Sequence, residues 1–190
     1  MTNFDFAFSL FVIVLGLGLA EVFGGLARAV KARPRVRIGW ATGLLATWTI
    51  TRTALFWRLI WRTRDTFPDS SAALLAGVLI CGLFYFTGAL VFPSTLEGRT
   101  GLDDYFMQEK AKAIGALLAA NALAYALRPL ILGWASWSYM NWLDRIGLAI
   151  IFGAGTVAML TKRRGLAIGS LAVLVADGLL GSVARAIWSI

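Results

Sequence analysis

The sequence predicts an all-α polytopic membrane protein, a bundle of about six transmembrane helices joined by short loops. Of its 190 residues, 59% are hydrophobic, and the mean hydropathy is +0.76. A water-soluble core of this size cannot enclose so much apolar surface, so the bilayer must act as its solvent. The apolar runs are continuous and rich in Leu, Ala and Gly, whereas the strands of a transmembrane β-barrel alternate apolar and polar residues.

Six apolar stretches come close to the length that crosses a bilayer, which takes about 20 helical residues. They use most of the chain, so residues 1–190 are expected to form a single transmembrane domain. Pro34, Pro68, Pro93 and Pro129 punctuate the chain at or near the boundaries of these stretches. The expected spans are 4–30, 40–61, 72–92, 111–127, 139–161 and 166–188.

The first stretch could be mistaken for a signal peptide, and the fifth stretch is weakly bounded. The first lacks a basic start, carries Asp5 there, and is longer than the apolar region of a signal peptide, which has about 7–15 residues. We therefore expect it to remain as a span rather than to be cleaved. The fifth stretch has the weakest boundaries, and a bundle of five spans follows if this segment lies in the membrane interface.

Small residues recur at helical spacing in several of these stretches. Gly16, Ala20 and Gly24 are spaced by four residues in the first stretch, and Gly165 and Gly169 are spaced by four in the sixth. Such stripes allow helices to approach closely in lipid. We therefore expect these faces to pack against protein, either within one chain or between subunits.

The longest connection precedes the fourth stretch and contains several acidic residues. Asp103 and Asp104 are expected at the N-terminus of a helix, where carboxylates are favoured. Glu109, Lys110 and Lys112 then follow on a cytoplasmic extension of the fourth span. We expect this extension to present a solvated face.

The net charge of +8 comes from 18 basic and 10 acidic residues. In a soluble protein this charge would suggest nucleic-acid binding, but in a membrane protein it reports orientation first, and no nucleic-acid partner is expected. With six spans, the loops after the first, third and fifth share one side and hold eleven of the 18 basic residues. The positive-inside rule places this side in the cytoplasm. Both termini should therefore face outward, in what we expect to be a bacterial cytoplasmic membrane.

The loop after the first span is the most basic of these connections. Arg33, Arg35 and Arg37 lie within five residues of one another. Clusters of this kind beside a membrane are attracted to anionic lipid headgroups. We expect these three arginines to contact anionic lipid.

Three ionisable residues fall within the expected spans, where charges are costly and need an explanation. Counted from Trp40 and Gly165, Arg52 and Asp177 each lie twelve residues into their spans, which is about 18 Å and close to the bilayer midplane. Glu21 lies about 10 Å from the cytoplasmic surface by the same count. We expect Arg52 to meet Asp177, with Glu21 joining them if the guanidinium bends toward the cytoplasm.

Two interpretations of these charges remain open. They are either a dry structural ion pair that sets helix register, or they line a polar cavity. In a cavity, arginine would attract a small anion because its planar fork matches oxyanion geometry, and the carboxylates could relay protons. The candidate pore- or substrate-lining residues are Glu21, Thr49, Arg52, Tyr85, Asn121 and Asp177.

The residue types that are missing also restrict the chemistry. The chain has no histidine and a single cysteine, Cys81, in the middle of the third stretch. These absences remove the usual zinc sites and Ser-His-Asp catalysis, and there is no GxxxxGK phosphate loop. We therefore expect no metal site, no cofactor and no enzymatic activity.

The sequence favours a channel or transporter for a small solute or ion, such as a small anion or a proton. Because six short spans enclose little volume, we expect a homo-oligomer in the lipid bilayer. The main alternative is a non-catalytic membrane scaffold or subunit whose buried charges are structural. A third and less favoured class is an intramembrane enzyme that works with Asp, Glu and Arg alone.

Overall fold

The computed structural model describes residues 3–32, 36–96, 101–132 and 142–188. Within these ranges the chain forms six α-helices and no named β-strand, which confirms the all-α class. The helices are α1 (Asn3–Lys31), α2 (Trp40–Arg62), α3 (Ser71–Val91), α4 (Leu102–Leu132), α5 (Trp142–Leu160) and α6 (Arg164–Trp188).

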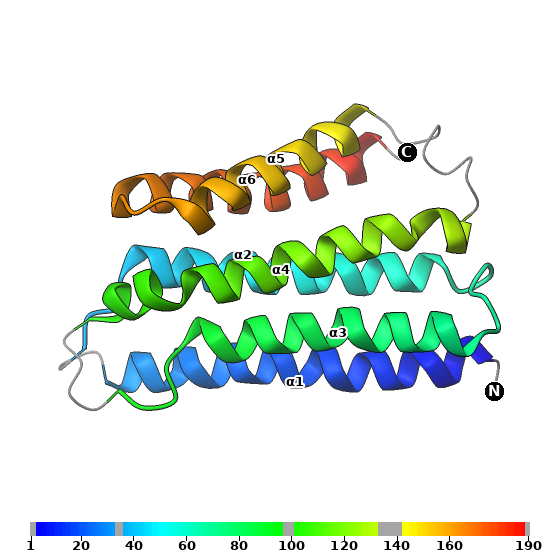
Figure 1. Ribbon diagram of the computed structural model, residues 1–190, viewed down its shortest axis with the longest axis horizontal. Helices are drawn as coiled ribbons and strands as arrows, with labels where there is room; N and C mark the ends of the chain where they lie inside the picture. The colour runs from blue at the N-terminus through cyan, green and yellow to red at the C-terminus, as the bar shows by residue number, and fades with distance from the viewer. Residues whose placement is uncertain (1–2, 33–35, 97–100, 133–141, 189–190) are drawn as a thin grey trace.

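The helices are arranged in three layers of two, and the helices of each layer lie side by side (Figure 1). The pair α1 and α3 forms one outer layer, α5 and α6 form the other, and α2 and α4 lie between them. Consecutive helices run in opposite directions, so Asn3 and Trp188 lie at the same end of the bundle. We call this end the terminal end, and the opposite end, where α2, α4 and α6 begin, the basic end.

Among the described residues, four helices are long and apolar enough to cross a membrane, namely α1, α3, α5 and α6. Only 22% to 33% of the residues in the most apolar part of each helix are buried. Large apolar side chains such as Phe6, Leu75 and Leu180 are instead more than 60% exposed. An outer surface of this kind suits hydrocarbon rather than water. The chain therefore has the architecture of a membrane protein.

The remaining helices, α2 and α4, are long enough but less apolar than the other four. Charged and polar residues interrupt both, Arg52 in α2 and Asn121 in α4 among them. The fifth expected stretch, α5, is one of the four apolar helices, and the two less apolar helices form the middle layer. Apolar helices on both sides compensate for the lower hydropathy of this middle pair.

The fourth helix is longer than the expected span 111–127. It begins at Leu102 and continues through Pro129 to Leu132. Proline lacks the N–H that would bond the carbonyl one turn earlier, but only three residues follow it in the helix. Pro129 therefore lies inside the last turn of α4, near its boundary.

The outer helices α1 and α3 approach closely through glycines. A methyl group placed on Gly88 of α3 would lie 2.5 Å from the carbonyl oxygen of Gly18 in α1, and one on Gly18 would lie 3.0 Å from the Cα of Tyr85. By contrast, a methyl group on Gly16 would meet nothing within 4 Å, and one on Gly24 would meet only Arg28 of its own helix. Within this chain, the stripe through Gly16 and Gly24 makes no close approach to another helix, because the α1 backbone meets α3 at Gly18.

The sixth helix shows the same difference between a small-residue pattern and an actual contact. Methyl groups on Gly165 and Gly169 would meet nothing within 4 Å, so these glycines make no close approach to another helix of this chain. Gly178 does make a close approach, since a methyl group on it would lie 2.9 Å from Cγ2 of Thr51 in α2. Spacing alone defines a face of small residues, but it does not say which face meets a neighbour.

One buried carboxylate joins three helix N-termini at the basic end. Asp103, the second residue of α4, is 6% exposed and pairs with Arg164, the first residue of α6. Its carboxylate also lies against Gly39, the N-cap of α2, where a side chain would overlap it. Next to it, the Leu102 N–H donates a 3.1 Å hydrogen bond to the carbonyl of Arg37. Negative charge is favoured at helix N-termini, so Asp103 stabilises this junction.

Replacing Gly88 with Ala should destabilise the protein by about 1–3 kcal/mol, since the added methyl group would overlap the α1 backbone and force the two helices apart. Thermal unfolding of the protein in detergent micelles measures this change. Gly82→Ala on the same helix is the matched control, because a methyl group there meets nothing within 4 Å. The control should be neutral or stabilising by up to about 1 kcal/mol. Equal losses in the two variants would contradict the close approach of α1 and α3.

Candidate functional site

The centre of the bundle contains a polar contact between the two middle helices. Arg52 lies twelve residues after the start of α2 and ten before its end. Its guanidinium Nη2 donates a hydrogen bond to Oδ1 of Asn121 in α4. Asn121 is 3% exposed, and its own Nδ2 donates to the Leu117 carbonyl at 2.7 Å. A charge-assisted hydrogen bond therefore joins the less apolar helices halfway along the bundle.

Asp177 of α6 lies at the same level. It is half-buried, and its Oδ1 is near enough to α5 that a methyl group on Gly147 would lie 3.5 Å from it. The next residue, Gly178, packs against Thr51 of α2, which precedes Arg52. The carboxylate of Asp177 therefore lies beside α5 at Gly147. We refer to Arg52, Asn121 and Asp177 together as the polar layer.

The threonines around Arg52 are bonded within their own helix. Thr49 and Thr53 are buried, and their hydroxyls donate to the carbonyls of Leu45 and Thr49, each at 2.8 Å. Thr51 does the same with Thr47 at 2.8 Å. These bonds to the carbonyl four residues earlier satisfy the hydroxyl donors without a ligand. Thr49 is therefore in the interior, as a lining residue would be, but its donor is already used.

Glu21 and Tyr85 lie outside the polar layer. Both are exposed, Glu21 on α1 and Tyr85 on α3, and these two helices form the outer layer on the opposite side of the bundle from α6 (Figure 1). The structure thus brings Arg52, Asn121 and Asp177 to one level of the interior, and it places Glu21 and Tyr85 on the outside. Sequence spacing predicts the depth of a residue along its helix but not the direction in which it faces.

The arginines expected to contact lipid are described only in part. Arg33 and Arg35 lie outside the described residues. The Arg37 side chain is exposed at the basic end of the bundle, and its backbone is held by the bond from Leu102. Arg37 is therefore accessible to a headgroup beside the membrane.

Lys110 is a buried residue whose role was missed by sequence reasoning. The expected solvated face is wrong at this position, since Lys110 is only 5% exposed. Its Nζ donates to three carbonyls at the end of α5, those of Ala158 (2.6 Å), Met159 (2.9 Å) and Thr161 (2.6 Å). These are carbonyls that a helix end leaves without partners. The ammonium uses all three of its donors and so fastens α4 to α5.

Burying the Lys110 ammonium has an electrostatic cost, and the spacing of apolar residues after Lys110 could have indicated its burial. Desolvation lowers the pKa of Lys110 from its ordinary value. The residue shares a helix face with Ala113, Ile114 and Leu117, which follow it by three, four and seven positions and are fully buried. This spacing of apolar residues could have predicted an inward-facing lysine.

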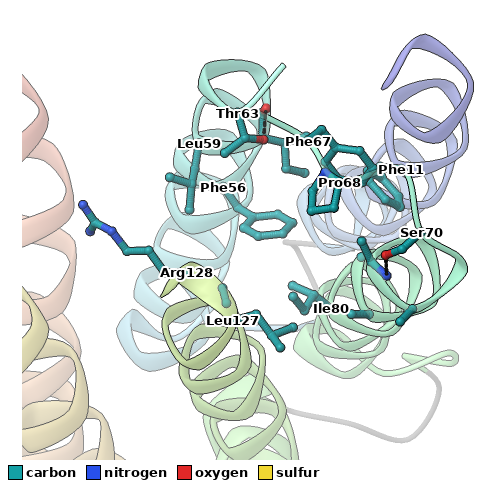
Figure 2. Close-up of a pocket in the computed structure, with 16 residues that line it drawn as sticks. Phe11, Phe56, Leu59, Thr63, Phe67, Pro68, Ser70, Ile80, Leu127 and Arg128 are labelled. Atoms are coloured by element: carbon teal, nitrogen blue, oxygen red, sulfur yellow. Dashed lines mark hydrogen bonds between the residues drawn. The ribbon is translucent and has the colours of Figure 1, made fainter. Parts of the chain in front are cut away.

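A pocket of about 260 Å³ lies at the terminal end, between α1, α2, α3 and α4 (Figure 2). Its walls are largely aromatic and aliphatic. Because the residues come from four helices and the α2–α3 connection, no local pattern in the sequence indicates the pocket. Residues that line it include Phe11, Phe56, Phe67, Pro68, Ile80 and Leu127.

No family model, curated protein or solved structure matches this chain. Among the described residues, no group of three or more His, Cys, Asp or Glu side chains could hold a metal ion. The function therefore has to be argued from the polar layer and the pocket.

Replacing Lys110 with Met should destabilise the protein by about 2–3 kcal/mol, because it leaves three carbonyls of α5 without their charged donor. Lys112→Met is the matched control, since Lys112 forms an exposed pair with Glu109 at 2.8 Å, which is worth up to about 1 kcal/mol. Thermal unfolding in detergent compares the two. A larger loss for Lys112→Met would refute the role assigned to Lys110.

Proposed function

We propose that the protein crosses the membrane six times and provides a passage for a small solute or ion, with the polar layer as its narrowest point. The observation that carries this proposal is the bond between Arg52 and Asn121, which lies between the middle helices at half their length. Ionisable side chains at membrane depth are costly and commonly mark the paths of ions and protons.

The layered arrangement supports a passage along the middle pair. The 23 residues of α2 extend about 34 Å, which is enough for a hydrocarbon core of about 30 Å. The four apolar helices flank α2 and α4 on both sides. They would shield a polar route from lipid while leaving it open along the bundle axis.

The chemistry of the polar layer favours a small anion or a proton as the solute. An oxyanion or halide that reached this level would compete with the Asn121 oxygen for the N–H groups of Arg52. Asp177, at the same level, could carry a proton instead. We propose the anion first, because the guanidinium holds a fixed charge, whereas a carboxylate can be neutralised.

The exposed carboxylate of Glu21 supports the homo-oligomer that we propose. Glu21 lies ten residues before the end of α1, a candidate span, and faces outward. A charge that faces lipid is costly. Contact with another protomer would cover it.

The second candidate function is a non-catalytic scaffold or subunit, and one observation favours it. The hydroxyls of Thr49 and Thr53 and the amide of Asn121 donate to carbonyls of their own helices. Donors that are used in this way need no solute, as in a structural role that fixes helix register.

Anion flux into liposomes that contain the purified protein tests the passage. Arg52→Ala should reduce chloride or phosphate flux by about tenfold or more, which corresponds to about 1.4 kcal/mol, and Arg52→Lys should keep part of it. Arg58→Ala is the matched control, because Arg58 is exposed nearer the terminal end of the same helix. If folded Arg52→Ala carries wild-type flux, or if the wild type carries neither anions nor protons, the scaffold is the better description.

Reporter fusions test the orientation that we propose. With six spans and the basic end in the cytoplasm, alkaline phosphatase fused to either terminus should be active in a bacterial host, and a fused green fluorescent protein should be dark. Opposite results at the two termini would mean an odd number of spans. In this orientation Arg37, with Arg33 and Arg35, would face the anionic lipids of the inner leaflet.

A further inference from the structure

The pocket at the terminal end has walls that are held in place by packing between aromatic rings. Phe67, from the α2–α3 connection, contacts Phe4 and Phe11 edge to face, with ring centroids 5.9 Å and 6.2 Å away. Phe56 stacks on Phe84 at 4.9 Å. Aromatic pairs at these separations are favourable. Three phenylalanines that line the pocket, Phe11, Phe56 and Phe67, are therefore held in place without a ligand.

The polar groups beside the pocket are already used or point elsewhere. The Thr63 hydroxyl donates to the Ile60 carbonyl at 2.7 Å, and the Ser70 hydroxyl accepts from the Ala73 N–H at 3.2 Å as the N-cap of α3. Only the stem of Arg128 borders the pocket, and its guanidinium points away from it (Figure 2). A ligand that needed hydrogen bonds would lose them here, and water would find too few partners.

The pocket volume sets the size of the ligand. A cavity of about 150 Å³ lined by aliphatic and aromatic residues binds benzene. By proportion, the roughly 260 Å³ here would hold roughly ten carbon atoms. Lipid tails are as apolar as the pocket, so selection has to come from the fit to its aromatic walls rather than from hydrophobic transfer.

We propose that this pocket binds a hydrocarbon segment of about ten carbons. The pocket lies near the ends of α2 and α4 and the start of α3, so the chain enters from the leaflet next to the terminal end. The segment is either part of the acyl chain of a bilayer lipid or a free hydrocarbon. The proposal is independent of the passage at the polar layer, because none of the three polar-layer residues lines the pocket.

Photolabelling of the full-length protein in vesicles tests the proposal with two probes. One probe is phosphatidylcholine with a diazirine in its acyl chain, and the other is a free alkane that carries the same group. Labelling should concentrate within 72–80 and 124–127, the pocket-lining parts of α3 and α4. Ala76→Phe, which fills the pocket from α3, should reduce labelling in both segments by about tenfold, and Ala124→Phe should do so from α4.

The matched control is Ala54→Phe, an exposed position of α2 away from the pocket, which should leave the labelling unchanged. Labelling by the lipid probe alone identifies an acyl chain as the ligand, and labelling by the alkane alone identifies a free hydrocarbon. If both pocket-filling variants fold, elute as the wild type does from gel filtration, and keep full labelling with both probes, the proposal is wrong.

Discussion

The constraint on which the rest of this structure depends is that hydrocarbon supplies no hydrogen bonds. Polar groups inside the bundle must therefore find partners within the protein. The threonines of α2 bond their own helix, Lys110 satisfies the last carbonyls of α5, and Arg52 bonds Asn121. The bonds of Lys110 and Arg52 also join two helices each, so the same hydrogen bonds that satisfy polar groups help to hold the bundle together.

The same constraint explains why the less apolar helices lie in the middle. The pair α2 and α4 carries Arg52 and Asn121, and the four apolar helices cover it on both sides. Such a design keeps Arg52 in the interior of the bundle, beside Asn121. The pocket at the terminal end lies between the same middle pair and the α1–α3 layer, yet its walls are apolar. The bundle thus combines a polar interior level with an apolar recess near its terminal end.

Sequence reasoning predicted properties that belong to a single helix, such as its length and the depth of a residue along it. It failed for properties that depend on which helices pack against one another. Apolar length predicted the helices, and counting residues put Arg52 and Asp177 at one level. Counting could not show that Glu21 faces outward, because the direction of a side chain depends on which helices surround it. For the same reason spacing could not show that Gly18, rather than Gly16, is the glycine of α1 that meets α3. The pocket, assembled from four helices, leaves no periodic signal at all.

The Asp103 junction has a consequence for the order in which the chain is assembled. Asp103 meets Arg164 across a separation of 61 residues, and the same carboxylate rests on Gly39. A growing chain emerges from its N-terminus, so α2 and α4 are synthesised well before the arginine that completes the junction. The pair of Asp103 with Arg164 can therefore form only after the start of α6 has been made. The arginine then adds a charged contact to a junction whose other two helices were made long before it.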